Sequence, residues 1–219
     1  SADDGLMGHQ GFVGAHLPGG GAVTGPDLAL DSYKFPDNKY KLHACCHGLR
    51  PMIEALQASE AAAGVPLDDI KSFSLSTNPR WLAVCDIKRP RTGLEVKFSY
   101  NWLAGMTLRG DNTGDDRLFT DTIAGEAELG HFAERISVTG DDQLTDLQAR
   151  GEISLTDGRA IPVWFDLADP FAPEVLAEKL QRKSSTIIGD AGAAIWDLHP
   201  RLGQLGARDI ASAMLAASA

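Results

Sequence analysis

An Asp-Gly turn between two extended segments is the feature that most constrains the fold of this chain. Gln148–Leu155 and Ala160–Asp166 are predicted strands, and Thr156-Asp157-Gly158-Arg159 joins them. Asp-Gly between two extended runs is a strong signal for a β-hairpin, because a tight hairpin turn needs residues that tolerate positive φ. The two segments are therefore predicted to pair in an antiparallel sheet.

The spacing of apolar residues predicts the other strands and helices. Ile70–Thr77 alternates apolar and polar side chains, which predicts a half-buried strand, and Ile136–Val138 is a further short strand. Glu95–Arg109 is expected to begin extended and to end as an apolar helix, with a loop over 111–121. Other helices are predicted over 49–63, 126–134, 173–183, 191–198 and 207–217. This order indicates an α+β fold with an antiparallel sheet, flanking helices and a helical C-terminal piece.

Length and composition are those of an ordinary globular chain. The 219 residues allow one large domain or two small ones, and a chain of this size buries roughly 70% of its unfolded surface. The 43% hydrophobic and 23% charged fractions argue against a disordered chain. No segment approaches the roughly 18 consecutive apolar residues of a membrane span, so no membrane partner is expected.

The charge balance argues against a nucleic-acid partner. The chain carries 20 basic and 30 acidic residues, a net charge of −10, whereas nucleic-acid binders depend on a basic excess or a basic stripe. The one dense basic run, Lys88–Arg91, is interrupted by Pro90 and is interpreted as a solvated loop. An anionic substrate would therefore need a local basic pocket.

The first residues of the chain and its cysteines indicate how the protein is processed and where in the cell it is located. Residues 1–40 are rich in glycine and poor in periodic pattern, which favours a connector whose upstream partner is missing. The start at Ser1 suggests a processed or excised end, and the first ten residues do not form a signal peptide. Three cysteines, two of them adjacent, make a poor disulfide framework, so a cytoplasmic location is predicted.

Candidate site residues are densest over 40–50, immediately before the first strong helix. Lys41 and Arg50 would suit a carboxylate substrate near a helix N-terminus, where backbone N–H groups and the dipole favour anions. The alternative is that both are plain surface charges. Tyr100 could donate a proton or bind a substrate oxygen; equally, it could be a core tyrosine with a satisfied hydroxyl.

The same segment contains two histidines and two cysteines, which raises the question of a metal. The spacing of His43, Cys45, Cys46 and His47 is unlike that of a structural zinc site, and no second pair follows because Cys85 stands alone. No metal is therefore predicted, although a metal-binding module is kept as a third hypothesis. Cys45 is interpreted as a small buried hydrophobe.

Several short motifs follow one another along nearly the whole chain. They are Lys41-Leu42-His43-Ala44-Cys45-Cys46, Pro51-Met52-Ile53-Glu54-Ala55-Leu56, Ile70-Lys71-Ser72-Phe73, Asn78-Pro79-Arg80, Val96-Lys97-Phe98-Ser99-Tyr100, Arg135-Ile136-Ser137-Val138 and Thr156-Asp157-Gly158-Arg159. Each motif alone is weak, but their order is fairly specific. In this order they resemble the MmgE/PrpD family, which contains 2-methylcitrate dehydratase, cis-aconitate decarboxylase and iminodisuccinate epimerase.

The resemblance implies that this chain is the C-terminal half of a longer enzyme. Family members carry a smaller α+β lid domain on an all-helical N-terminal domain, and the active site lies between the two. Residues 1–35 would be the tail of the helical domain, 36–186 the lid, and 187–219 helices that return to the helical domain. A homodimer is the assembly that the resemblance favours.

The resemblance also implies a cofactor-independent lyase or isomerase that acts on a small polycarboxylic acid. Lys41 matches the family's site lysine, Tyr100 a site tyrosine and His43 a recurrent motif histidine, so these three are the predicted catalytic residues. Arg50 and Cys46 depart from the family pattern and are predicted to bind substrate. Cys46 stands where cis-aconitate decarboxylase has a histidine, which argues against that activity.

Two expectations follow for the isolated chain. The family's other catalytic histidines lie in the helical domain, so the 219-residue chain alone is expected to be inactive. The alternative hypothesis is a non-catalytic binding or assembly module of the same fold.

Overall fold

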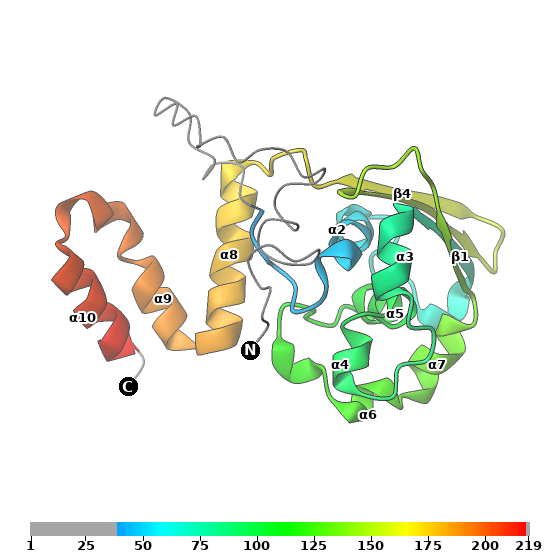
Figure 1. The fold of residues 1–219 in the computed structure, drawn as a ribbon, viewed down its shortest axis with the longest axis horizontal. Helices are drawn as coiled ribbons and strands as arrows, with labels where there is room; N and C mark the ends of the chain where they lie inside the picture. Colours follow the sequence, from blue (N-terminus) through cyan, green and yellow to red (C-terminus); the bar gives the residue numbers. More distant parts are fainter. Residues whose placement is uncertain (1–38, 218–219) are drawn as a thin grey trace, which may run out of the picture. The chain divides into compact units, whose positions relative to one another are not determined.

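The computed structural model describes residues 39–217 (Figure 1). The predicted connector over residues 1–35 lies outside this range. The helices are α2 (Arg50–Ala58), α3 (Pro79–Cys85), α4 (Gly93–Val96), α5 (Tyr100–Arg109), α6 (Asp121–Ala124), α7 (Ala127–Ala133), α8 (Pro173–Ile188), α9 (Asp190–Trp196) and α10 (Ala207–Ala217). The strands are β1 (Ile70–Thr77), β2 (Ile136–Gly140), β3 (Gln148–Leu155) and β4 (Ala160–Asp166), and short 3-10 turns are η2 (His47–Leu49), η3 (Leu67–Asp69), η4 (Asp116–Leu118) and η5 (His199–Gln204).

The four strands form one sheet in the order β2-β1-β3-β4. The predicted hairpin is confirmed: β3 and β4 pair antiparallel from Gln148 opposite Asp166 to Ser154 opposite Ala160, and Gly158 takes the positive φ of the turn, 91°. β1 pairs antiparallel with β3 but parallel with β2. The α+β class is therefore confirmed. The sheet is mostly antiparallel, and its one parallel pair, β1 and β2, is joined by the long connection that parallel strands require.

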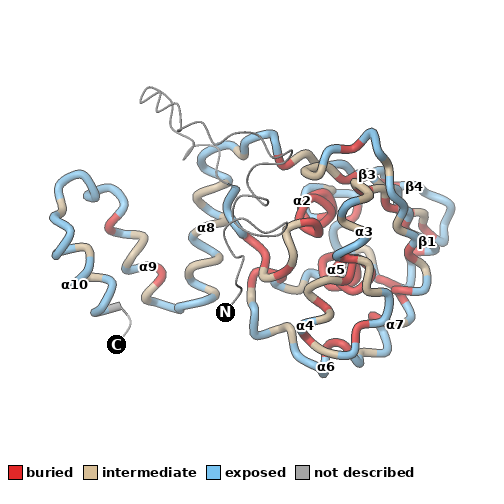
Figure 2. The backbone as a smooth tube through the Cα atoms, in the orientation of Figure 1, coloured by how far each residue is buried: buried red, intermediate tan, exposed pale blue. Residues whose placement is uncertain are grey.

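The hydrophobic core lies between the sheet and two buried helices, α2 and α5. α2 contacts α5, β3 and β4, and its apolar residues Met52, Ile53 and Leu56 are buried. Buried residues run along nearly the whole of α2 and α5 (Figure 2). Pro51 occupies the first turn of α2, where its missing N–H costs nothing. α2 therefore begins directly after the 40–50 segment and fixes it against the core.

The helix predicted over 49–63 is too long. α2 ends at Ala58 because Ser59 adopts an extended backbone (φ −86°, ψ 99°), and the chain then turns so that Ala62 is buried. Gly64 takes a φ of 73° before the chain enters the next turn. The apolar Ala62 is thus part of the core without being helical.

The prediction that Glu95–Arg109 begins extended is wrong. The side chain of Thr92 accepts a hydrogen bond from the backbone N–H of Glu95 and caps α4, while Ser99 accepts one from Trp102 and caps α5. The expected loop over 111–121 contains η4 and the first residue of α6, which Thr120 caps in the same way. Local side-chain caps thus make helix where the apolar pattern alone predicted extended chain or loop.

The C-terminal helices lie close to their predicted bounds, and α9 (Asp190–Trp196) ends two residues before the predicted Leu198. α8 runs five residues beyond the predicted Lys183, to Ile188, and α10 has the predicted bounds. α9 packs against α8, and α10 packs against α9. Over residues 39–217 no helix has both the length and the apolar character needed to cross a membrane.

Candidate functional site

The segment 41–46 is held by backbone hydrogen bonds on both sides. The N–H of Ala44 donates to the carbonyl of Thr113 (2.8 Å), and the N–H of Cys46 donates to the carbonyl of Lys97 (2.9 Å). The segment therefore lies between the loop that follows α5 and the end of α4. One pocket opens beside each of these neighbours.

The first of these, here called the Lys41 pocket, has a volume of about 420 Å³. It is lined by Lys41, Ala44, Cys45, Cys46, Leu94, Lys97 and Phe98. Within residues 39–217 neither lysine has a carboxylate partner, and the Lys97 ammonium lies 5.1 Å from the centre of the Phe119 ring. Two uncompensated positive charges thus face one cavity.

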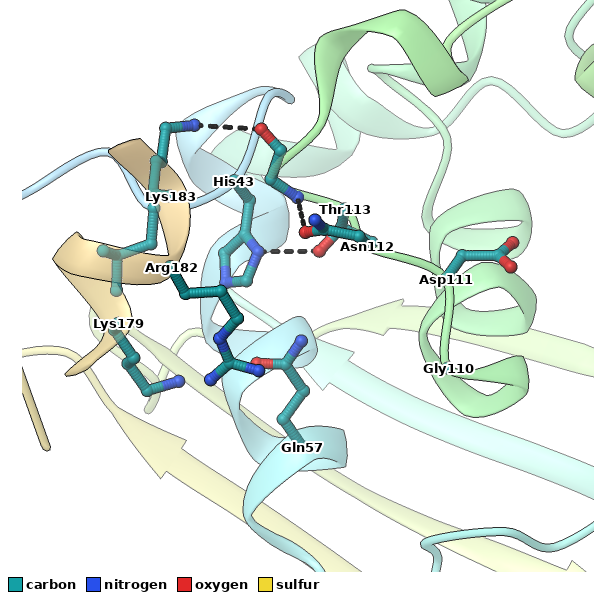
Figure 3. A pocket seen from close by; sticks show the side chains of 11 residues that line it. His43, Gln57, Gly110, Asp111, Asn112, Thr113, Lys179, Arg182 and Lys183 are labelled. Carbon is teal, nitrogen blue, oxygen red and sulfur yellow. Dashed lines mark hydrogen bonds between the residues drawn. The ribbon is translucent and has the colours of Figure 1, made fainter. Parts of the chain in front are cut away.

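The second, here called the α8 pocket, has a volume of about 220 Å³ and lies between α8 and the loop after α5 (Figure 3). Its lining combines three cations of α8 with polar groups of the loop and of α2. The lining residues are Leu42, His43, Gln57, Gly110, Asp111, Asn112, Thr113, Gly114, Lys179, Arg182 and Lys183. Lys41 and His43 therefore belong to different pockets, although only one residue separates them.

His43 is held by hydrogen bonds at both ring nitrogens. Nδ1 lies 2.7 Å from Oγ1 of Thr113, and Nε2 lies 3.1 Å from Oε1 of Glu54. Because a carboxylate only accepts, Nε2 carries the proton and donates to Glu54, while Nδ1 accepts from the Thr113 hydroxyl. All three residues are buried. The imidazole edge lines the α8 pocket, but neither nitrogen is free to take a substrate proton in this arrangement.

Glu54 is the buried acid at the centre of this network. Its exposed fraction is 1%, and its second oxygen, Oε2, accepts a hydrogen bond from Nζ of Lys179 at 2.8 Å. Burial opposes ionisation of Glu54, but hydrogen bonds from His43 and Lys179 outweigh it and lower its pKa. Burial lowers the pKa of His43, against the opposing hydrogen bond to Glu54, so the imidazole is neutral. Glu54 is therefore a buried carboxylate paired with Lys179 and a neutral histidine.

Arg50 is a buried cation whose hydrogen bonds are incomplete. Its exposed fraction is 4%, its Nε lies 3.9 Å from Oε1 of Glu54, and its Nε and Nη1 have no hydrogen-bond partner within the described residues. Burial lowers the pKa of Arg50, and the nearby Glu54 carboxylate opposes this shift. A buried guanidinium with unsatisfied donors is costly, which marks it as a candidate anion-binding group.

Tyr100 lies in the core at the first residue of α5. Its side chain is fully buried; its hydroxyl donates to the carbonyl of Gly48 at 2.8 Å and lies 3.1 Å from Oγ1 of Thr77. Burial raises its pKa far above the usual range. The hydroxyl would have to leave one of these partners to contact a substrate.

The cysteines of the segment are free thiols. Cys45 is buried and Cys46 is half-buried, and both line the Lys41 pocket. Burial raises the pKa of the Cys45 thiol to about 12, so it is protonated at neutral pH. In the part of the chain that the structure describes, no group of three His, Cys, Asp or Glu side chains is arranged to hold a metal ion.

The predicted site residues do not share one cavity, and sequence reasoning missed several of their neighbours. Lys41 and Cys46 share one pocket, His43 faces another, and Arg50 and Tyr100 are buried apart from both. The missed residues are Glu54 and Thr113, which bind His43, and the cations of α8. The sequence does contain a signal for the cations of α8. Arg182 and Lys183 follow Lys179 by three and four residues, a spacing that places side chains on one face of a helix.

Comparison with known proteins gives one family. The family described as MmgE/PrpD C-terminal domain matches residues 43–199, which is well over half of the chain. No curated protein matches it. The matched range runs from His43 to η5 and begins two residues after Lys41.

Proposed function

Since the chain belongs to the MmgE/PrpD family, we propose that it is the C-terminal part of a cofactor-independent lyase or isomerase acting on a small polycarboxylic acid. The reaction would resemble that of 2-methylcitrate dehydratase or iminodisuccinate epimerase. Such chemistry removes a carbon-bound proton beside a carboxylate, so it needs a base, cations that hold carboxylates, and stabilisation of enolate-like charge.

The Lys41 pocket carries this proposal. In a chain with a net charge of −10, two lysines line one cavity and neither is paired with a carboxylate within residues 39–217. Local positive charge in an acidic protein favours an anionic ligand. A carboxylate between Lys41 and Lys97 would gain charge-assisted hydrogen bonds from one or both ammonium groups. Cys46, on the same wall, would contact the substrate through its thiol.

Arg50 supports the same ligand class. Its two buried, unpartnered nitrogens would be satisfied by a second carboxylate, and bidentate Arg–carboxylate contacts are strong and geometrically specific. We assign Arg50 the role of an additional carboxylate clamp. Reaching it requires a rearrangement at the start of α2, because its Nε and Nη1 are closed off from solvent.

The base for the carbon-bound proton is proposed to come from outside this chain. Among residues 39–217 no histidine or carboxylate lines the Lys41 pocket, both nitrogens of His43 are engaged, and the Tyr100 hydroxyl is held by Gly48 and Thr77. We therefore propose that a helical N-terminal domain supplies the base and that the isolated chain is inactive. His43 would orient the 41–46 segment, and Tyr100 remains a predicted substrate contact.

A non-catalytic binding or assembly module is the second candidate. This candidate is favoured because the side chains of His43 and Tyr100, two of the predicted catalytic residues, already form hydrogen bonds within the protein. Such a module would keep the basic pocket as a binding site and would not catalyse proton exchange even when joined to a helical domain.

Exchange of substrate protons with solvent tests the proposal. The protein isolated from its natural source is incubated in D2O with citrate, 2-methylcitrate and short dicarboxylates, and loss of C–H signal is followed by NMR. We expect exchange for at least one acid, and we expect Lys41→Ala to slow it by tenfold or more, since a charge-assisted contact contributes about 1.5–3 kcal/mol. Lys71→Ala, an exposed lysine on β1, is the matched control.

The outcomes separate the two candidates. Exchange that depends on Lys41 supports the enzyme. No exchange by the natural protein, together with Lys41-dependent binding of the same acids, supports the binding module. Exchange that Lys41→Ala leaves unchanged would remove Lys41 from the site.

A further inference from the structure

The α8 pocket presents three cations from a single helix face. Lys179, Arg182 and Lys183 stand three and four residues apart on α8, a spacing that places their side chains on neighbouring positions of one face. Opposite them lies the loop from Gly110 to Gly114, whose first residue is the left-handed glycine that ends α5. Figure 3 shows the three cations extending from α8 toward this loop and toward α2.

Two of the three cations form no ion pair with a carboxylate among residues 39–217. Lys179 is paired with Glu54, and the pocket's one acid, Asp111, is held by Arg109 through a 2.6 Å contact between Nη2 and Oδ2. Within the described residues Arg182 has no polar partner, and the one polar contact of Lys183 is the carbonyl of Gly114 at 3.3 Å. Within residues 39–217 neither Arg182 nor Lys183 forms an ion pair, although the charge of the Asp116 carboxylate stabilises the Lys183 ammonium from outside the pocket lining.

Several polar groups of the loop already have hydrogen-bond partners, which leaves the cations as the main groups to bind a ligand. Backbone N–H groups of Asp111, Thr113 and Gly114 donate to Met106, Asp111 and the side chain of Asn112. The amide nitrogen of Asn112 donates to Thr186. Gln57 remains, since its side-chain amide has no hydrogen-bond partner among residues 39–217 and the Arg182 side chain extends toward it (Figure 3).

We propose that the α8 pocket is a binding site for a small dianion, held by Arg182 and Lys183 with Gln57 as a hydrogen-bonding group. Two cations match two negative charges, and the paired N–H donors of a guanidinium fit both carboxylate and phosphate groups. The cavity of about 220 Å³ is smaller than a typical drug-sized pocket, which restricts the ligand to inorganic phosphate or a short dicarboxylate.

Burial of Lys183 adds to this argument. Removal from water lowers the pKa of its ammonium group, because burial disfavours the charged form. An anion next to the ammonium would favour the charged form and offset this effect.

This site is independent of the proposed enzymatic function. The Lys41 pocket and the α8 pocket share no lining residue, and the segment 41–46 contributes to both. A dianion in the α8 pocket would contact the segment next to His43, on the side away from Lys97. The α8 site stands even if the chain proves to be a binding module.

NMR titration of the full 219-residue chain with sodium phosphate and, separately, with sodium succinate tests the site. We expect saturable shifts of the Gly114 backbone amide and of the Gln57 side-chain amide. Arg182→Gln should weaken the binding by about tenfold or more, since one charge-assisted contact is lost. Arg182 is exposed and has no partner within the described residues, so this variant keeps its fold.

Two controls make the test decisive. Arg208→Gln removes the same charge from exposed α10 and should leave both affinities unchanged. Tighter binding of phosphate than of succinate identifies phosphate as the ligand, and the reverse order identifies a dicarboxylate. The site is refuted if neither anion produces saturable shifts at these groups, or if Arg182→Gln binds as tightly as the native chain.

Discussion

Lys179 on α8 donates a hydrogen bond to Glu54 on α2 across 2.8 Å, although 125 positions separate the two residues. The same carboxylate accepts a second hydrogen bond from His43, which begins the segment matched by the family. One buried acid thus joins the C-terminal part of the chain to the helix behind the candidate site. The stability of this arrangement rests on ionic contacts rather than on apolar packing alone.

Removal of Lys179 should destabilise the fold. Lys179→Met leaves Glu54 buried with a neutral histidine and a guanidinium 3.9 Å away, so the free energy of unfolding should fall by about 2–3 kcal/mol. Urea denaturation measures the change. Lys71→Met, an exposed lysine on β1, should change stability by less than about 0.5 kcal/mol. Equal effects of the two variants would show that the buried pair contributes nothing.

Stability should fall as the solution is acidified below the ordinary histidine pKa of 6.5. The pKa of His43 is lower in the folded chain than in the unfolded chain, so unfolding takes up a proton between the two values. Stability is therefore fully present above the unfolded pKa and is lost as pH falls through this window. Glu54, whose pKa is also lowered in the fold, extends the loss below its ordinary value of 4.5.

His43→Gln isolates the histidine contribution. Glutamine can still donate to Glu54 but does not titrate. Between pH 6.5 and 5, the free energy of unfolding of the native chain should decrease more steeply than that of the variant, by up to about 1.4 kcal/mol per pH unit. Urea denaturation at several pH values measures both slopes. Parallel slopes would mean that His43 is as easily protonated in the folded chain as in the unfolded one.

Tyr100→Phe tests the structural role of the Tyr100 hydroxyl. The substitution removes the hydroxyl that donates to Gly48 and contacts Thr77, which leaves a buried carbonyl unsatisfied and should cost about 1–2 kcal/mol of stability. The midpoint of urea denaturation should fall with an unchanged slope. An unaltered midpoint would show that the hydroxyl is not needed in the core.

The parts of the fold that could be predicted are those determined by residues close together in the sequence. The β3–β4 hairpin follows from Asp157-Gly158 and was predicted with its bounds, and α10 was likewise predicted from its apolar spacing. α3 was missed although it has a local signal, since Asn78 caps it and Pro79 occupies its first position. The parallel pairing of β1 with β2 has no local signal, because it depends on the helices between them.

The same distinction applies to the site. The cluster of reactive side chains over 40–50 was visible in the sequence, but its division between two pockets was not. That division depends on Thr113 and Lys97, which fix the two sides of the segment from positions far along the chain. The burial of Glu54 could not be predicted either, because its compensating cation is contributed by α8.

The measurement that most directly tests the central claim is an NMR titration of the 219-residue chain with tricarballylate, an unreactive tricarboxylate. Carboxylate binding in the Lys41 pocket predicts saturable shifts of the Cys46 and Lys97 amides, with an affinity that Lys41→Gln reduces by about tenfold or more. An unchanged affinity in Lys41→Gln, or shifts confined to the loop from Gly110 to Gly114, would contradict the claim.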